Sequence, residues 1–144
     1  MIKKVDSSFD EETRTTYCYI TDDKGRISIG EAICHEEDTD VMSWRTGEEI
    51  AFRRAKIHCL QTIRACDIKP ALAALKHLYS CINRSAKFNP NSYENSMLQR
   101  QIRQLEFDLA TNKEMVAYER KNLKAYIDGK EKIYQRIRKA KSEQ

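Results

Sequence analysis

Turn-forming residues are scarce in this sequence, because 144 residues contain only four Gly and two Pro. Gly and Pro are the residues that most often interrupt or reverse regular structure, so their scarcity excludes a loop-rich fold. No apolar run approaches the roughly 20 residues that a transmembrane helix needs. The segment at residues 1–6 has no apolar core of a signal peptide, so we expect a cytosolic protein.

Motifs of enzymes and metal sites are missing as well. The five Cys include no CxxC pair, which predicts reduced thiols rather than a zinc site or a disulfide framework. There is no Walker loop, GxGxxG or HExxH, and no catalytic set can be argued from spacing. The acidic residues at 35–40 follow Cys34, but consecutive acids on a loop rarely converge on one ion. We therefore expect no enzyme, no metal and no cofactor.

The net charge of +4 conceals an uneven distribution. Residues 1–50 carry six Lys or Arg and thirteen Asp or Glu, whereas residues 51–144 carry twenty and nine. The basic part attracts anions and the acidic part repels nucleic acid. Subunits of opposite polarity can also pack head against tail.

The first third of the chain has the pattern of a small antiparallel sheet. β-Branched and aromatic residues predict strands at Thr15–Ile20 and 27–34, joined by a turn in which Gly25 adopts a positive φ. A short edge strand is expected at 2–5, followed by a polar loop to residue 12. Gly30 indicates a bulge or bend. Two strands are marginal alone, so a helix must cover them or another subunit must extend them.

Helical patterns occupy the rest of the chain, which gives an α+β fold in a single domain, 1–144. Thr46 and Glu49 match a capping box that opens a helix to about residue 66. Pro70 ends that helix region and suits the first turn of the next one, which runs to about residue 84. The expected regions are a sheet at 1–45, two helices at 46–84, a loop at 85–92 and a long helical region at 93–140.

That long region carries a heptad seam, in which nine of twelve positions are apolar. A helix of this length reaches about 70 Å. A single small domain has too little body to cover it, so we expect a second copy to do so and the helix to mediate oligomerisation. Asn112 on the seam would fix the register of pairing. A break at Asp128 and Gly129 is the alternative, but we expect a mostly continuous helix. The seam positions are Leu98, Ile102, Leu105, Leu109, Asn112, Val116, Glu119, Leu123, Tyr126, Lys130, Ile133 and Ile137.

The loop at 85–92 combines an aromatic side chain with amides. Phe88 is followed by two Asn, and Ser92 can cap the next helix, whose free N–H groups then point at the loop. An aromatic face, amides and a helix N-terminus suit a nucleotide. The alternative is an ordinary turn between helices, with Phe88 packed in the core.

In layout, the chain resembles the first type of phage Thoeris anti-defence protein, a family of small signal-sequestering sponges. The resemblance rests on the hairpin Thr15–Cys34, the helix start Gly47–Ala55, the loop Phe88–Ser92 and the long basic C-terminal helix. It implies a phage protein of the host cytoplasm that binds glycocyclic ADP-ribose, made by host TIR-domain enzymes, without cleaving it. Family members bind the signal between two protomers, assemble into higher oligomers such as hexamers, and in some cases also bind cyclic oligonucleotides.

The resemblance also implies which residues bind the ligand. Phe88 matches the aromatic residue that stacks on adenine. Asn89, Asn91 and Asn95 are the candidates for the neighbouring amide, and which of them corresponds stays open. Cations for the phosphates are implied on the long helix and on the first helix. These cations are Arg120 and Arg136 on the long helix, with Arg53, Arg54 or Arg64 on the first helix.

Other classes of function fit parts of the sequence. A nucleic-acid-binding protein fits the basic part, although the acidic N-terminal part argues against it. A coiled-coil protein that binds a partner fits the seam. A nucleotide-degrading enzyme lacks a catalytic set.

Overall fold

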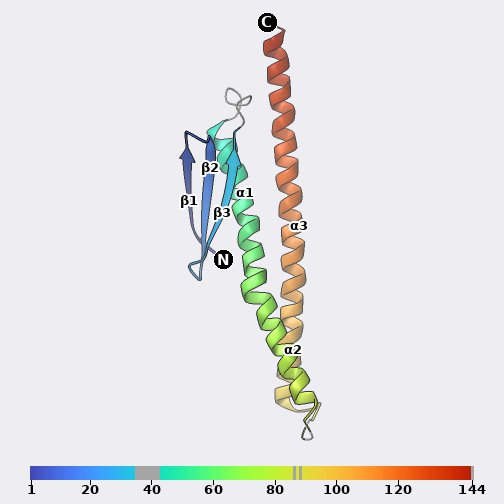
Figure 1. Cartoon of the computed structure of the whole chain (residues 1–144). Coiled ribbons are helices and arrows are strands. Elements are labelled where there is room, and N and C mark those ends of the chain that lie inside the picture. The colour runs from blue at the N-terminus through green and yellow to red at the C-terminus, as the bar shows by residue number, and fades with distance from the viewer. Residues whose placement is uncertain (35–42, 86, 88, 144) are drawn as a thin grey trace. The chain divides into compact units, whose positions relative to one another are not determined.

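The computed structural model describes residues 1–34, 43–85, 87 and 89–143. A three-stranded antiparallel sheet at the N-terminus is followed by helices, which confirms the predicted α+β class (Figure 1). Contacts group the chain into two compact units, one formed by Met1–Cys59 with Val116–Gln144 and the other by Leu60–Met115. We call them the sheet unit and the hairpin unit.

The sheet has the order β1–β2–β3 and is larger than the sequence predicted. Strand β1 spans Ile2–Asp10, so the loop expected after residue 5 is wrong. The polar residues of β1 are tolerated because it is an edge strand whose backbone pairs with β2, Thr15–Asp22. A tight turn then follows, in which Asp10 Oδ1 accepts a hydrogen bond from the N–H of Glu12 at 3.0 Å and Arg14 has φ 54°.

The second turn confirms the prediction for Gly25, which has φ 78°. It joins β2 to β3, Ile27–Ile33, and is organised by the buried carboxylate of Asp22. Asp22 Oδ1 accepts hydrogen bonds from the N–H groups of Lys24 and Arg26, both at 2.9 Å, and Oδ2 accepts one from Arg26 Nε at 2.7 Å. Burial alone would raise the pKa of Asp22, but these bonds outweigh it and the pKa is lowered.

Gly30 does not form the bulge that the sequence suggested, because the register between β2 and β3 is regular through it. Its role is close packing: a Cβ at this position would collide with the backbone of Ala51 and Ala55 in helix α1. Helix α1, Trp44–Ile63, lies against that face of the sheet (Figure 1). The buried side chains of this layer are small and medium-sized, and they include Cys18, Ile20, Ala32, Ala51 and Ala55.

The start of α1 corrects the predicted capping box. Helix α1 begins at Trp44, so Thr46 lies inside it and Ser43 is the residue before it. Ser43 Oγ accepts a hydrogen bond from the N–H of Thr46 at 3.1 Å and lies 2.9 Å from its hydroxyl. Thr46 is 3% exposed, so its side chain is a buried partner of the cap rather than the cap itself.

Pro70 lies in the first turn of the next helix, as the sequence predicted, but the chain stays helical where a break was expected before it. A π-helical segment, η2 (Arg64–Ile68), connects α1 directly to α2, Lys69–Asn83. The N–H of Lys69 donates to the carbonyl oxygen of Arg64, five residues earlier. In a regular α-helix the ring of Pro70 would collide with the carbonyl of Cys66, and the wider π turn accommodates the ring without ending the helix.

Helix α3 is continuous from Tyr93 to Ser142, so Asp128 and Gly129 do not interrupt it. Among the described residues, no helix is both long and apolar enough to cross a membrane. The seam of α3 is buried or half-buried from Leu98 to Lys130, and only Ile133 and Ile137 are exposed, at 45% and 36%.

The seam is covered by the same chain, which corrects the premise that one chain is too small to do so. In the hairpin unit, α2 contacts α3 through Lys76 with Glu106 and Tyr79 with Gln99. In the sheet unit, Lys56 of α1 forms an ion pair with Glu119 at 2.9 Å. Most of the seam is already covered within the chain, and self-association through α3 is a prediction that the structure of one chain does not test.

Candidate functional site

The loop before α3 has the cap that the sequence predicted. Ser92 Oγ accepts a hydrogen bond from the N–H of Asn95 at 3.2 Å, and its carbonyl oxygen accepts one from Ser96 at 3.0 Å. Phe88, the predicted stacking residue, lies outside the described residues. Asn89 and Asn91 are exposed, and Asn89 Oδ1 accepts a hydrogen bond from the N–H of Asn91 at 3.0 Å. The oxygen of Asn89 therefore shapes the loop, and the side chain of Asn91 lies at the surface.

Asn95 differs from the other two asparagines because it is only 3% exposed. Its Nδ2 donates to the carbonyl oxygen of Pro90 at 3.0 Å, which ties the loop to the first turn of α3. Its Oδ1 is buried and has no hydrogen-bond partner among the described residues. An unpaired buried acceptor costs roughly 1–3 kcal/mol, so such an atom needs an explanation.

Arg64 does not lie at this loop. Its Nε donates to Asn112 Oδ1 at 2.8 Å, and Asn112 Nδ2 donates to the carbonyl oxygen of Leu60 at 2.9 Å. Asn112 and Asn95 are separated by seventeen positions on one helix, which is about 25 Å at 1.5 Å per residue. Within one chain, Arg64 therefore fastens two helices instead of facing the loop.

The remaining predicted cations belong to the sheet unit and are dispersed. Arg54 donates from Nη1 to the carbonyl oxygen of Glu31 at 2.7 Å. Arg53 pairs with Glu49 at 2.8 Å and lies 5.2 Å from the ring centre of Tyr126.

Arg120 and Arg136 are both exposed on α3 and are sixteen positions apart, about 24 Å along its axis. One chain therefore cannot bring both of these guanidinium groups to the same phosphate.

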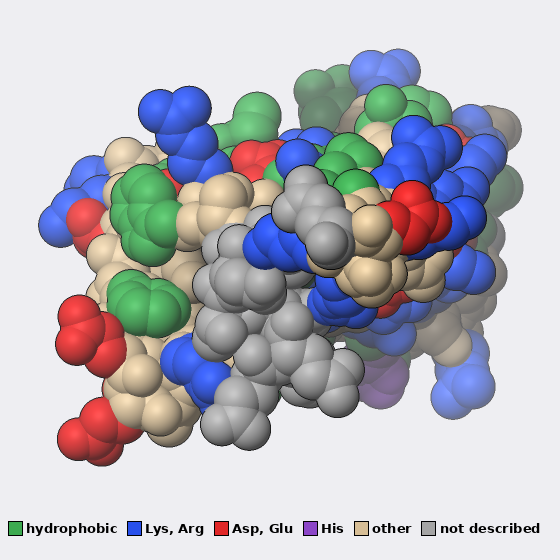
Figure 2. Space-filling view, turned by 90° about the horizontal axis from the view of Figure 1, so that it is seen from above, with side chains coloured by type: hydrophobic (Ala, Val, Ile, Leu, Met, Phe, Trp, Pro, Cys, Tyr) green, Lys and Arg blue, Asp and Glu red, His purple; other side chains and the backbone are tan. Residues whose placement is uncertain are grey.

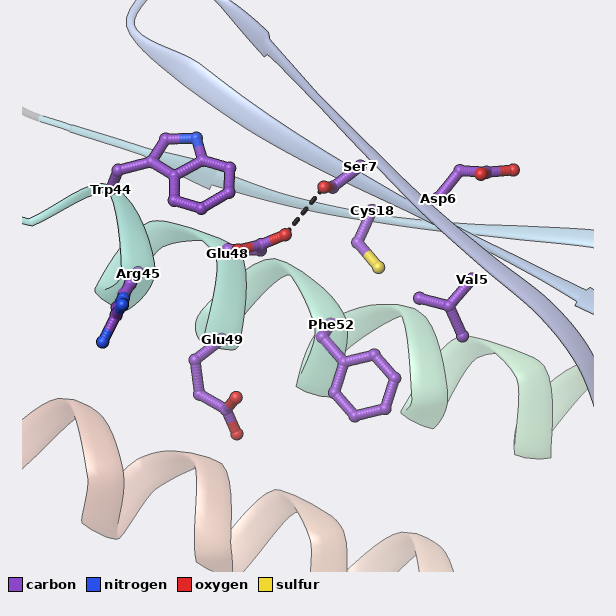
Figure 3. A pocket seen from close by; sticks show the side chains of 9 residues that line it. All are labelled: Val5, Asp6, Ser7, Cys18, Trp44, Arg45, Glu48, Glu49 and Phe52. Carbon is purple, nitrogen blue, oxygen red and sulfur yellow. Dashed lines mark hydrogen bonds between the residues drawn. The ribbon is translucent and has the colours of Figure 1, made fainter.

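A groove that the sequence did not predict lies in the sheet unit, with a volume of about 450 Å³. It separates the inner side of β1 from the first turns of α1 (Figure 3). Ser7 Oγ donates across it to Glu48 Oε1 at 2.7 Å, and Trp44 beside it is 59% exposed. No sequence signal marks it, because its two walls are about forty residues apart in the chain. Its lining residues are Val5, Asp6, Ser7, Cys18, Trp44, Arg45, Glu48, Glu49 and Phe52.

The cysteines do not supply a reactive thiol to the loop before α3 or to the groove. None of the five forms a disulfide, and Cys18 and Cys59 are buried. Burial raises the pKa of Cys18, and the charges of Glu48 and Asp6 raise it further, so this thiol stays protonated. Burial likewise raises the pKa of Cys59. Within the described part of the chain, no three His, Cys, Asp or Glu residues are grouped to hold a metal ion, and the acidic stretch 35–40 lies outside that part.

A shallower hollow of about 460 Å³ lies on the hairpin unit between α2 and α3. Its wall contains the Tyr79–Gln99 hydrogen bond at 3.1 Å and the Lys76–Glu106 ion pair at 3.2 Å, so its polar groups already bind one another.

Comparison with protein families, curated proteins and solved structures gives no match.

Proposed function

We propose that the chain is a phage anti-defence protein that binds glycocyclic ADP-ribose and sequesters it without cleavage. The observation that carries the proposal is the buried Oδ1 of Asn95, which has no partner among the described residues. The oxygen is closed to solvent in the unliganded chain, so in this proposal the first turn of α3 opens on binding, and an adenine amino group or a ribose hydroxyl then donates the hydrogen bond that the oxygen lacks. Ligand binding would thus remove the free-energy cost of leaving the acceptor unpaired.

In this proposal the ligand site is shared between copies of the chain. Arg120 and Arg136 are about 24 Å apart on α3, so one diphosphate cannot contact both within a chain. In a homo-oligomer such as a hexamer, the loop of one copy and an arginine of another contribute to the same pocket. Phe88 then stacks on the base, and the arginine binds the phosphates.

The test is calorimetric titration with a panel of cyclic ADP-ribose isomers, followed by chromatography of the ligand after denaturation. We expect one isomer to bind and to be recovered intact. Phe88→Ala and Arg120→Ala are each expected to weaken binding about 10-fold, because stacking and charge-assisted bonds contribute ~1–3 kcal/mol each. Arg100→Ala is the matched control, since Arg100 is an exposed cation on α3 near the loop.

Two outcomes would contradict the proposal. If no isomer binds, or if the recovered ligand is hydrolysed, the chain is not a sponge. If Phe88→Ala lowers the melting temperature but leaves the affinity unchanged, Phe88 is a packing residue and the pocket is elsewhere.

A second candidate is binding of nucleic acid, favoured by the end of α3. Residues 130–143 contain six Lys or Arg and two Glu, and Figure 2 shows Lys and Arg side chains gathered around this end of the helix. Phosphate binding by such a cluster weakens steeply as salt increases. Retention of a DNA duplex at about 50 mM salt that is largely lost at about 200 mM, with no sequence preference and no nucleotide binding, would favour this candidate.

A further inference from the structure

The two edges of the sheet are treated differently by the rest of the chain. At the β3 edge, Arg54 Nη1 donates to the carbonyl oxygen of Glu31, and His58 Nδ1 accepts from the N–H of Ile29 at 3.4 Å. These side chains of α1 occupy the backbone groups with which another strand would pair. β1 is the other edge strand, and among the described residues no strand or side chain occupies its outer edge.

β1 also leaves apolar side chains uncovered on the face that α1 packs against. Val5, Ser7 and Phe9 lie on that face, because their register partners on β2 are buried residues. Yet Val5 is 47% exposed and Phe9 is 45% exposed. Val5 lines the groove of about 450 Å³, with Trp44 on its far wall (Figure 3). An open strand edge with uncovered apolar side chains, beside an unfilled groove of mixed apolar and charged lining, is a site for strand addition.

We propose that β1 pairs antiparallel with β1 of a second copy, around a two-fold axis at Ser7, to form a continuous six-stranded sheet. A two-fold axis perpendicular to the sheet keeps each residue on its own face, so opposite residues have numbers of equal parity. With the axis at Ser7, Val5 lies opposite Phe9 of the second copy. Lys4 lies opposite Asp10 of the second copy, and each pair occurs twice.

Charge distinguishes this register from its neighbours. An axis at Asp6 sets two copies of Asp6 opposite each other, and an axis at Ser8 sets Asp6 opposite Asp10, so both registers oppose like charges. An axis at Val5 would run the pairing through Ile2–Lys4, where the register of β1 with β2 is irregular. The Ser7 axis uses the regular part of β1 and opposes charges of unlike sign.

The pairing would also fill the groove. Strand β1 of the second copy covers the open edge, and its Phe9 packs beside Val5 above Phe52 and Trp44. The apolar side chains that a single copy exposes on β1 are then buried against those of the other copy. The inference does not rest on ligand binding, because a chain that assembles in this way and binds no nucleotide leaves it intact.

The test is disulfide trapping in full-length protein in which the exposed Cys66 and Cys81 are replaced by Ser. Bridged cysteines have Cα atoms ~4.4–6.8 Å apart, as directly opposite residues do. A mixture of Val5→Cys and Phe9→Cys proteins is expected to form a covalent dimer under mild oxidation. Either protein alone is expected to form about 10-fold less, because identical positions are then four residues out of register, roughly 13 Å along the strand.

A matched control and a second pair keep the result interpretable. Val5→Cys mixed with Ser8→Cys is the control, because Ser8 lies beside the expected partner but on the opposite face. If replacing Phe9 weakens assembly, Asp6→Cys mixed with Ser8→Cys tests the same register with Val5 and Phe9 in place. Absence of dimer in both pairs, equal dimer in the control, or self-linking of Val5→Cys would overturn the proposal.

Discussion

Helix α3 contains two buried asparagines whose side-chain amides differ in how completely they are hydrogen-bonded. Asn112 is 5% exposed, and both ends of its amide are paired, with Arg64 on one side and the carbonyl oxygen of Leu60 on the other. Asn95 is 3% exposed, and only its Nδ2 is paired, while its Oδ1 has no partner among the described residues. Both belong to the hairpin unit.

The difference separates a structural residue from a candidate binding residue. A buried amide with all its bonds made fixes how two helices align, since any shift breaks those bonds. A buried amide with an unpaired oxygen gives up stability, and a ligand that donates a hydrogen bond can recover it. Replacing Asn112 by Ala should therefore mainly lower stability, and replacing Asn95 by Ala should mainly lower ligand affinity.

The largest effect on stability is expected for Asn112→Ala. This substitution removes two hydrogen bonds and leaves the half-buried Arg64 without its partner, so we expect a loss of roughly 2–3 kcal/mol in the free energy of unfolding. Urea denaturation followed by circular dichroism measures it, with Arg103→Ala at an exposed position of α3 as the control. Nucleotide affinity should stay within twofold of the parent protein. A loss below ~0.5 kcal/mol would mean that Asn112 does not align the helices.

A smaller loss is expected for Asn95→Ala. The substitution breaks one hydrogen bond, to Pro90, but it also removes the unpaired oxygen, so the net loss should be about 1 kcal/mol or less. Affinity for the bound isomer should instead drop about 10-fold, as measured by calorimetric titration. If Asn95→Ala proves as destabilising as Asn112→Ala and leaves affinity unchanged, the comparison fails and Asn95 is purely structural.

The smallest expected effect is on the pH dependence of stability, which depends on Asp22, a buried carboxylate whose hydrogen bonds are made as those of Asn112 are. Its pKa is lower in the folded chain than the ordinary value of 3.8, so the unfolded chain binds more protons below that pH. Stability from Asp22 is then complete above pH 3.8 and is lost as the pH falls toward the folded pKa. Denaturation series should show a shallower acid dependence for Asp22→Asn, and an unchanged slope would contradict this.

Local chemistry made much of the fold predictable. The strand at Thr15–Ile20, the positive φ of Gly25 and the cap at Ser92 all follow from preferences of single residues or short segments. The continuous α3 was likewise visible as a sustained seam. Of the candidate site, the loop and its capped helix were predictable, and the choice among its asparagines was not, because burial distinguishes Asn95 from Asn89 and burial is not written in a short motif.

Packing decided the features that local patterns predicted wrongly. Gly30 taken in isolation predicts a bulge. The close approach of the Ala51 and Ala55 backbone explains why this position has no side chain. Pro70 lies in the first turn of α2, as the sequence predicted, but the π segment η2 joins α1 to α2 without the expected break.

The sequence by itself determined the strands, the turns and the periodicity of the helices, because each depends on residues a few positions apart. Tertiary structure decided which surface covers the seam of α3, which edge of the sheet stays open and which asparagine keeps an unpaired oxygen. Those outcomes depend on segments forty or more residues apart, such as Leu60 and Asn112, whose meeting is set by the packing of whole elements.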